Sequence, residues 1–245
     1  MSSQHWYNSD MLIIGHRGAA GLAPENSMKA MAAGYEANAD MLEIDVRLTK
    51  DLHVVAMHDP RLARTHHHRD AVSGITYEQL QELTKDNPVP MIDAILDKYF
   101  GKILLNIEVK SRDCGEALVA LLESRYVKKP SDWDKLIISS FKGNELSRIR
   151  KLAPHANLAL LHNENPFLFI AYQRSLKLTA VGFHRLYLNP LALEIARRAG
   201  IFIYAYTVDR LGSLSFLEDQ GVEGVVTNYP DKFIQAVNKE LEKKD

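Results

Sequence analysis

The chain has 245 residues, 46% of them hydrophobic and 25% charged, a balance typical of one large globular domain. Its 30 lysines and arginines nearly match its 31 aspartates and glutamates, which gives no reason to expect binding to nucleic acid or to an acidic membrane surface. No apolar run approaches the roughly 18 residues of a membrane span, so we expect no stable membrane insertion. With the single cysteine Cys114, and with no basic and apolar leader in MSSQHWYNSD, the sequence predicts a cytoplasmic protein.

Short apolar runs recur along the chain, separated by stretches with helical spacing. They are continuous rather than alternating, as expected of strands buried on both faces of a parallel sheet. From residue 136 onward they recur every 21–23 residues, the cadence of repeated strand–helix units. This pattern predicts one α/β domain over residues 1–245, a (β/α)8 TIM barrel. The predicted strands are residues 11–15, 41–45, 103–109, 136–140, 157–161, 179–183, 201–206 and 224–227.

Two later helices carry clear end signals. Pro190 suits the first position of one helix, and Gly200 suits the position that follows its end. For the next helix we expect Asp209 to cap the amino terminus and Gly221 to close the carboxyl terminus.

One long interval interrupts the repeat, because the second and third predicted strands start at residues 41 and 103. It contains a further strand-like run at 53–58 and then a polar stretch from about 61 to 90. The sequence therefore predicts a hairpin that returns along the second strand, followed by a small insertion.

The stretch LEIDVRLTKDLHVVAMHD carries the most chemical information. Glu43 and Asp45 are two residues apart, so on a strand both side chains point to the same face. If the chain turns back at residues 50–53, Asp45 lies directly opposite His58, with the two Cβ atoms ~5 Å apart. We therefore expect one hairpin to bring Glu43, Asp45 and His58 together.

The stretch ILLNIEVK repeats this spacing with Glu108 and Lys110. In a barrel, the carboxyl ends of the strands face the active-site mouth, so three carboxylates would converge there. A divalent cation would remove their repulsion, and an all-oxygen ligand set suits Mg²⁺, Ca²⁺ or Mn²⁺ better than Zn²⁺. The structural alternative is an ion pair of Glu108 with Arg17 or Lys110.

The first predicted strand ends in IIGHRGAAGLAPENS, at the same rim. The guanidinium of Arg17 presents a planar fork suited to two phosphate oxygens. His16 and His58 can exchange protons near neutral pH. Gly15 and Gly18 permit a tight turn and close approach of a ligand. Either Asn26 or Ser27 can cap the helix that follows. A cation, an arginine, a lysine and two histidines around one mouth describe the surroundings of a phosphate ester.

These motifs resemble those of the glycerophosphodiester phosphodiesterases: HRG at 16–18, PENS at 24–27, EID at 43–45, HD at 58–59 and EVK at 108–110. The resemblance continues through SF at 140–141, YTVD at 206–209 and GVVTNYP at 224–230, so it covers nearly the whole chain. It implies a TIM barrel with a small insertion after the HD motif. It also implies hydrolysis of small-molecule glycerophosphodiesters to sn-glycerol 3-phosphate and an alcohol, with Mg²⁺ or Ca²⁺ as cofactor.

The resemblance also assigns roles to residues. It implies that His16 and His58 are the catalytic acid–base pair and that Arg17 and Lys110 bind the phosphate. The implied metal ligands are Glu43, Asp45 and Glu108. Which histidine is the acid, and whether the nucleophile is water or a glycerol hydroxyl of the substrate, stay open at this point.

Four positions differ from the usual pattern of the family, the mildest being Ser27 where threonine is common. Tyr206 stands where tryptophan is frequent, Asp209 where asparagine is, and Asn228 where aspartate is. None belongs to the implied catalytic or metal-binding set. We therefore expect these differences to affect substrate preference rather than catalysis.

Three other functions remain open. A lysophospholipase D-like phosphodiesterase on the same barrel would need an apolar groove beside the mouth, and residues 167–169 could supply exposed apolar side chains. A Schiff-base aldolase would use Lys110 and no metal. A barrel without activity would bind phosphodiesters and signal to a partner.

Overall fold

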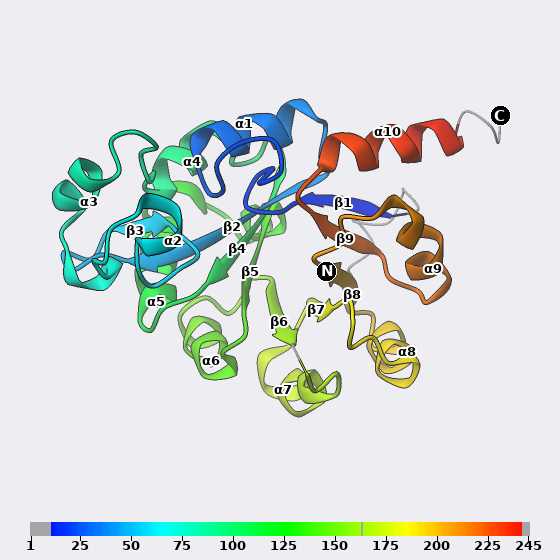
Figure 1. The fold of residues 1–245 in the computed structure, drawn as a ribbon. Helices are drawn as coiled ribbons and strands as arrows, with labels where there is room; N and C mark the ends of the chain where they lie inside the picture. The colour runs from blue at the N-terminus through cyan, green and yellow to red at the C-terminus, as the bar shows by residue number, and fades with distance from the viewer. Residues whose placement is uncertain (1–10, 163, 242–245) are drawn as a thin grey trace.

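The computed structural model describes residues 11–162 and 164–241, which form a barrel surrounded by helices (Figure 1). Within these residues, eight strands lie parallel to their neighbours, and β1 pairs with both β2 and β9. The sheet is therefore closed, and the predicted TIM barrel is confirmed. Its strands are β1 (Leu12–Gly15), β2 (Met41–Leu48), β4 (Leu104–Val109), β5 (Leu136–Ser140), β6 (Leu158–His162), β7 (Ala180–His184), β8 (Phe202–Tyr206) and β9 (Gly224–Thr227).

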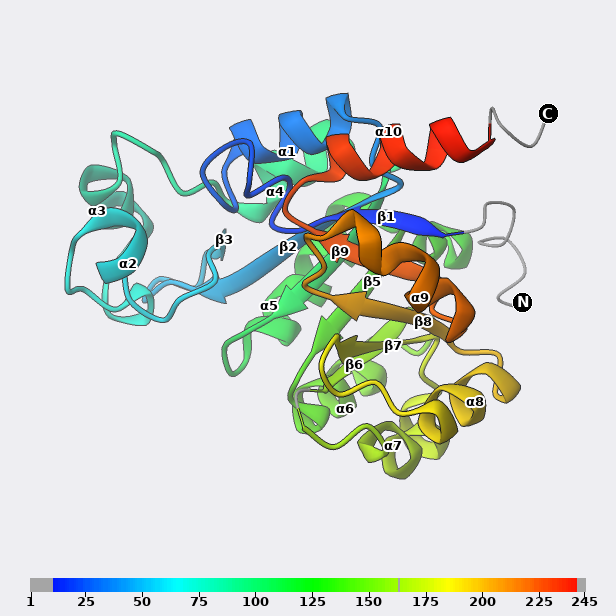
Figure 2. The same ribbon diagram turned by 45° about the vertical axis from the view of Figure 1, so that its right-hand side comes forward.

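Helices join successive strands and cover the outside of the barrel, as Figure 2 shows from a second direction. Between the two layers lie buried side chains such as Ile13 and Leu105 from strands and Leu146 and Phe233 from helices. Burial of each contributes roughly 1.5–3 kcal/mol to folding. The helices outside the interval between β2 and β4 are α1 (Met28–Glu36), α5 (Cys114–Leu121), α6 (Gly143–Leu152), α7 (Leu168–Leu176), α8 (Pro190–Arg198), α9 (Leu214–Asp219) and α10 (Pro230–Leu241).

Alternation along the strands separates the inside of the barrel from the outside. In β2, Leu42 and Ile44 belong to the outer core, whereas Met41 packs inside the barrel with Phe202 and Tyr204. Because alternate residues of a strand point to opposite faces, the residues that follow Met41 at steps of two also face inward. Apolar side chains thus occupy the amino-terminal part of the interior, and charged side chains occupy the carboxyl ends.

The interval between β2 and β4 contains the predicted hairpin and a helical segment. Strand β3 (Val54–Ala56) pairs antiparallel with the end of β2. The helices α2 (Ala63–His66), α3 (Tyr77–Leu83) and α4 (Ile92–Tyr99) follow, with a 3-10 turn at Val72–Gly74. The segment has a small apolar core of its own, formed by Val55, Met57, Leu62, Val72, Ile75, Leu80 and Val89.

The predicted register of this hairpin is wrong by one residue. Val46 pairs with Ala56, and the backbone N–H of Met57 donates to the carbonyl of Asp45 at 2.9 Å. Met57 therefore lies opposite Asp45, and His58 follows the end of the ladder. The turn decides this, because loop length and conformation set the register of a hairpin, and Leu52 in the turn has a positive φ of 66°.

The helix-end predictions are confirmed in one helix and partly wrong in the next. Pro190 opens α8, with Asn189 as its cap, and Gly200 follows the helix with a φ of 65°. Gly221 follows α9 with a φ of 78°. Asp209, however, does not cap α9, because a 3-10 turn at Leu211–Ser213 precedes that helix. The carboxylate of Asp209 instead accepts from Thr227, the last residue of β9, and from Asn228.

Among the described residues, no helix is both long and apolar enough to cross a membrane. The first ten residues, on which the targeting prediction was based, lie outside the described part of the chain.

Candidate active site at the carboxyl ends of the strands

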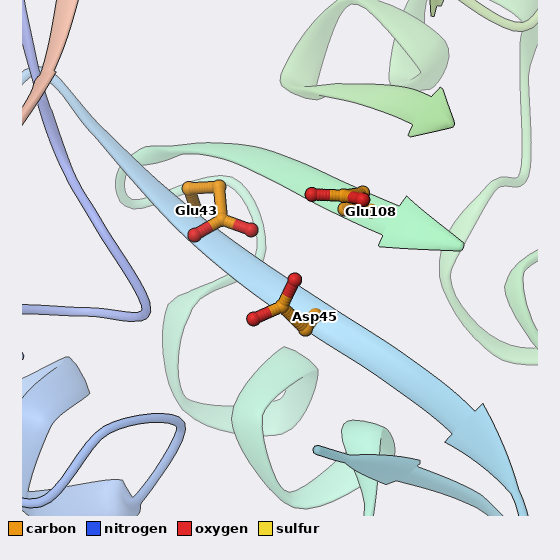
Figure 3. A group of neighbouring side chains, drawn as sticks. All are labelled: Glu43, Asp45 and Glu108. Carbon is orange, nitrogen blue, oxygen red and sulfur yellow. The ribbon is translucent and has the colours of Figure 1, made fainter. Parts of the chain in front are cut away.

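Three carboxylates from two neighbouring strands converge inside the barrel (Figure 3). Glu43 and Asp45 come from β2 and Glu108 from β4, and one oxygen of each lies within 4.8 Å of the others. Strand register explains this arrangement, since Asp45 pairs with Glu108 across the parallel ladder and Glu43 precedes Asp45 by two residues. The sequence prediction that these three side chains meet is confirmed.

Their surroundings divide the three carboxyl groups into two kinds. Burial, followed by the charge of Asp45, raises the pKa of Glu43 well above its usual range and that of Glu108 to about 7. Burial also acts to raise the pKa of Asp45, but the positive charges of Lys110 and Arg17 outweigh it and lower that pKa. Burial thus outweighs the nearby positive charges at Glu43 and Glu108 but not at Asp45.

Two fixed cations lie against the cluster. The ammonium of Lys110 is 2.5 Å from Glu108 and 3.2 Å from Asp45, and Nε of Arg17 is 3.1 Å from the other oxygen of Asp45. The ion pair of Glu108 with Lys110, the structural alternative, is therefore present, but it does not provide partners for all the carboxylate oxygens of the cluster. Oε1 of Glu43 is buried and has no hydrogen-bond partner among the described residues. A hard cation fits this donor set, because an uncompensated buried carboxylate oxygen is costly.

The loop after β1 places His16 and Arg17 beside the carboxylates. Its backbone is tied to β2, since the N–H of Arg17 donates to Oε2 of Glu43 at 2.8 Å and that of Gly18 donates to the Glu43 carbonyl at 3.0 Å. A Cβ on Gly15 would lie 2.0 Å from the Gly18 carbonyl oxygen, and Gly18 itself has a φ of 86°. Both glycines are needed for this turn.

The PENS motif supports the loop in two ways. Ser27 caps α1 by accepting from the N–H of Ala30 at 3.1 Å. Asn26, the other cap considered, instead binds Asp45: its amide nitrogen donates to the carboxylate at 2.9 Å, and its oxygen accepts from the Asp45 backbone at 3.1 Å. Asn26 therefore orients a carboxylate of the cluster.

His16 is held by a side chain from the end of β9. Its Nδ1 lies 2.7 Å from Oδ1 of Asn228, and its Nε2 lies 4.0 Å from Glu43. The amide nitrogen of Asn228 donates to Asp209 at 2.7 Å. Burial and then the charge of Arg17 lower the pKa of His16, which favours a neutral ring.

His58 is held by charged groups instead. Its Nδ1 lies 2.5 Å from Asp59, and Arg64 of α2 donates to Asp59 at 2.6 Å. Arg64 also makes two hydrogen bonds to Glu25, which in turn accepts from Arg17 at 2.8 Å. Burial alone would raise the pKa of Asp59, but the bonds from Arg64 and His58 lower it to about 2. Asp59 is therefore ionised at neutral pH.

A single cavity of about 340 Å³ joins these groups. Phe141 and Tyr206 form part of its wall and pack edge to face, with ring centroids 5.9 Å apart. The lining comprises His16, Arg17, Glu43, Asp45, His58, Asn106, Glu108, Lys110, Phe141, Leu161, Tyr204, Tyr206, Thr207 and Val226. All seven residues predicted from the sequence line this cavity.

Sequence reasoning missed four residues that support the site. Asn26 lies in a recognised motif but was assigned to the helix cap, and Arg64 lies in the insertion with no motif around it. Asn228 and Asp209 were noted as unusual positions and expected to act on substrate preference alone. That expectation is wrong for Asn228, which contacts His16 directly.

Comparison with known proteins identifies the family of the chain. A sequence model of the glycerophosphoryl diester phosphodiesterase family matches residues 16–232. The chain belongs to this family. It is therefore a phosphoric diester hydrolase, as its motifs predicted. The glycerophosphodiester phosphodiesterase of Caldanaerobacter subterraneus subsp. tengcongensis is 30% identical over 243 residues, covering 93% of this chain and 98% of the relative. That of Bacillus subtilis is 30% identical over 249 residues, covering 91% and 85%.

Solved structures share the barrel. The glycerophosphodiester phosphodiesterase of Thermotoga maritima superposes with a TM-score of 0.81 at 24% identity, covering 94% of this chain and all of that one. A phosphodiesterase of Oleispira antarctica, solved in complex with the product sn-glycerol-3-phosphate, has a TM-score of 0.83 at 22% identity and covers 97% of this chain. At these identities the likeness establishes the fold.

Proposed function

We propose that this protein is a metal-dependent glycerophosphodiester phosphodiesterase that releases sn-glycerol 3-phosphate and an alcohol. One observation carries the proposal: three converging carboxylates, two fixed cations and two histidines line one cavity of about 340 Å³. We further propose that the enzyme acts in the cytoplasm, and the buried free thiol of Cys114 is compatible with a reducing compartment.

Glu43, Asp45 and Glu108 would hold Mg²⁺ or Ca²⁺. When bound, the cation would supply positive charge next to a non-bridging phosphate oxygen and would stabilise the charge that builds up during displacement. The raised pKa values of Glu43 and Glu108 support this assignment, because they show that burial and the charge of Asp45 outweigh the positive charges of Arg17 and Lys110 at these two carboxyl groups.

Arg17 and Lys110 would bind the phosphate from the protein side. Both are held in place before substrate arrives, Arg17 by Glu25 and Asp45 and Lys110 by Glu108 and Asp45. Such preorganised charges stabilise a transition state without the cost of reorienting at the moment of reaction.

The two histidines would move the protons. One Nε2 takes the proton of the nucleophile, either water or the neighbouring glycerol hydroxyl, as its oxygen bonds to phosphorus. The phosphorus–oxygen bond to the alcohol then breaks, and the other histidine donates its proton to the departing oxygen. If the glycerol hydroxyl was the nucleophile, water then attacks the cyclic phosphate and opens it to glycerol 3-phosphate, with the proton-transfer roles of the two histidines reversed. Both rings use Nδ1 for a protein contact, which leaves Nε2 for this chemistry.

A second substrate class is favoured by one observation. A groove of about 490 Å³ shares Thr207 with the cavity and includes the exposed side chains Leu186 and Phe216 beside Arg185. Such a groove suits a lysophospholipid, the substrate of the lysophospholipase D-like alternative. Of the apolar segment proposed from the sequence, Leu168 is 39% exposed, whereas Phe169 is 1% exposed and packs against Phe183, and none of residues 167–169 lines this groove.

The remaining alternatives have less support. Burial acts to lower the pKa of Lys110, but Asp45 and Glu108 outweigh it and raise that pKa, so the amine stays protonated and is a poor Schiff-base nucleophile. A barrel without activity would not require two histidines that are both oriented through Nδ1 toward one cavity.

The deciding experiment measures release of glycerol 3-phosphate from glycerophosphocholine and glycerophosphoethanolamine by chelator-stripped protein, with and without Mg²⁺ or Ca²⁺. We expect release only with metal, and none from Asp45→Asn. Release from lysophosphatidylcholine alone would establish the second substrate class. No release from any of these substrates with either metal would overturn the proposal.

A further inference from the structure

Three side chains form a hydrogen-bonded row that leads away from the catalytic cavity. His16 contacts Asn228 through Nδ1 and Oδ1 at 2.7 Å, and Nδ2 of Asn228 donates to Oδ2 of Asp209 at 2.7 Å. Asp209 is itself fixed, because its other oxygen accepts from the Asn228 backbone at 2.8 Å and from the Thr227 hydroxyl at 3.1 Å. The row joins the ends of β1, β8 and β9.

The row has only one direction that satisfies every member. A carboxylate accepts hydrogen bonds and does not donate them, so the nitrogen of the Asn228 amide must face Asp209. The oxygen of that amide then faces His16, and it also only accepts. Nδ1 of His16 must therefore carry a hydrogen. With the amide reversed, its oxygen would face the carboxylate of Asp209, and no hydrogen would lie between these two acceptors.

This direction determines which nitrogen of neutral His16 has the lone pair. With the proton on Nδ1, Nε2 is the free acceptor, and Nε2 is the nitrogen on the side of Glu43 and the cavity. We propose that Asn228 and Asp209 are positioning residues that keep His16 in its Nδ1–H tautomer, so that His16 is the general base of the reaction. The inference depends on the proposed function, since it assigns a role within that reaction.

His58 has the opposite kind of partner and therefore the opposite role. Its Nδ1 faces the carboxylate of Asp59 at 2.5 Å, which is ionised and therefore stabilises a doubly protonated ring. The amide oxygen of Asn228 is neutral and offers His16 no such charge. Burial lowers the pKa of His58, while Asp45 and Asp59 act against it. With His16 as the base, His58 is left as the general acid, and the two rings differ by the charge of the group that holds Nδ1.

The tautomer of His16 can be read directly. In metal-free protein with 15N-labelled histidine, long-range 1H–15N correlation spectra distinguish the protonated ring nitrogen from the bare one, at a pH above the ordinary range of histidine pKa values. The His16→Ala spectrum identifies the His16 signals. We expect Nδ1–H in the wild type and a shift toward Nε2–H in Asn228→Leu. Wild-type His16 with its proton on Nε2 would overturn the inference.

Kinetics test the consequence of the tautomer. Asn228→Leu should lower kcat about 10- to 100-fold, the usual cost of losing a group that orients a functional histidine, with KM nearly unchanged. Asn228→Asp alone should also be impaired, because it puts two carboxylates in contact. Asp209→Asn alone releases the amide of Asn228 from its fixed direction, so a smaller loss of kcat is expected.

The double variant Asp209→Asn/Asn228→Asp supplies the rescue. It keeps the direction of the row, because the amide introduced at position 209 would donate to the carboxylate introduced at position 228, which still accepts from Nδ1 of His16. We expect its kcat to exceed that of Asn228→Asp alone. A double variant no better than that single variant would contradict the inference, since a merely structural pair has no preferred direction.

Failure of the inference and failure of the proposed function give different results. If His16→Ala releases product as fast as the wild type, the proposed role of His16 in catalysis is wrong. If His16→Ala is inactive while Asn228→Leu retains both the wild-type kcat and the Nδ1–H tautomer, the proposed function stands and the inference alone is wrong.

Discussion

The two histidines of the cavity are held by different regions of the molecule. His16 is held through Asn228 by the ends of barrel strands, where partners are placed by the parallel register of β1, β8 and β9. His58 is held through Asp59 by the insertion, where Arg64 reaches back from α2 with a side chain that is 50% exposed. One ring thus has a neutral partner at the end of a barrel strand, and the other has a charged partner that the insertion holds.

This contrast shows how one barrel can give two identical side chains opposite roles. A neutral acceptor fixes a tautomer without favouring a charged ring, whereas a carboxylate favours the imidazolium. The insertion-side contact depends on exposed charges and is therefore open to screening by salt. The barrel-side contact of His16 with the uncharged amide of Asn228 depends on backbone register, and salt should weaken it much less.

The largest expected effect is the loss of either ring. His16→Ala and His58→Ala should each lower kcat by ~10²–10⁴-fold, because each removes a proton-transfer group. Product release from glycerophosphocholine at saturating substrate measures this. Near-normal turnover in one of the two variants would remove the distinction between base and acid, since only one histidine would then take part in proton transfer.

Loss of the carboxylate that holds His58 should have a smaller effect. Asp59→Asn preserves an acceptor for Nδ1 but removes the charge, so we expect kcat to fall about 10- to 100-fold with little change in KM. Steady-state kinetics of Asp59→Asn and Asn228→Leu under the same conditions would compare the loss of kcat caused by removing each support. An Asp59→Asn enzyme with wild-type kcat would show that charge is unimportant on the insertion side.

Removing Arg64 tests the exposed part of that support. Arg64→Met should lower kcat about two- to five-fold, the range expected for an exposed ion pair, and should flatten the dependence of kcat on salt. Arg61→Met is a matched control in the same insertion, because the Arg61 side chain donates to the Arg69 carbonyl. Equal effects of the two substitutions would show that the insertion tolerates no arginine change, rather than that Arg64 supports His58.

The smallest expected effect on catalysis comes from substitution of a third histidine, His162, which is buried outside the cavity. The same substitution should have a separate effect on stability. His162 packs against Phe169 and Phe183, and neither ring nitrogen has a hydrogen-bond partner among the described residues. His162→Phe should therefore leave kcat unchanged. A large loss of kcat would show that a histidine outside the cavity also matters.

The stability effect of His162 follows from its pKa. Burial lowers the pKa of His162 from 6.5 to about 4, so the unfolded chain binds a proton first as the pH falls. The contribution of the neutral His162 ring to the free energy of unfolding is fully present above pH 6.5 and is lost between pH 6.5 and about 4. As the pH falls from neutral to about 5, the free energy of unfolding measured with urea should decrease by about 2 kcal/mol less in His162→Phe than in the wild type. Equal losses would mean that His162 is not kept neutral.

Much of the fold and the cluster of three carboxylates could be predicted because both follow from short-range periodicity. Buried strands that alternate with helices specify the barrel, and a spacing of two residues places Glu43 and Asp45 on one face. The strand-end rule then brings Glu108 to the same rim, and the register of β2 and β4 bears this out.

The supports of the two histidines could not be predicted in the same way. Asn228 lies 212 residues from His16, and Arg64 reaches Glu25 across 39 residues, so no local pattern connects either pair. The hairpin register was missed by one residue because it depends on the conformation of a turn rather than on the polarity of its arms.

By itself, then, the sequence determined the barrel, the seven charged and titratable residues of the cavity, and the family to which the chain belongs. These depend on side-chain periodicity and strand ends, which the order of residues specifies directly. Only the tertiary structure decided what holds His16 and His58, because the direction of a hydrogen bond depends on the group that faces it across the fold. A neutral amide lies on one side and a paired carboxylate on the other, and that difference in charge separates the base from the acid we propose.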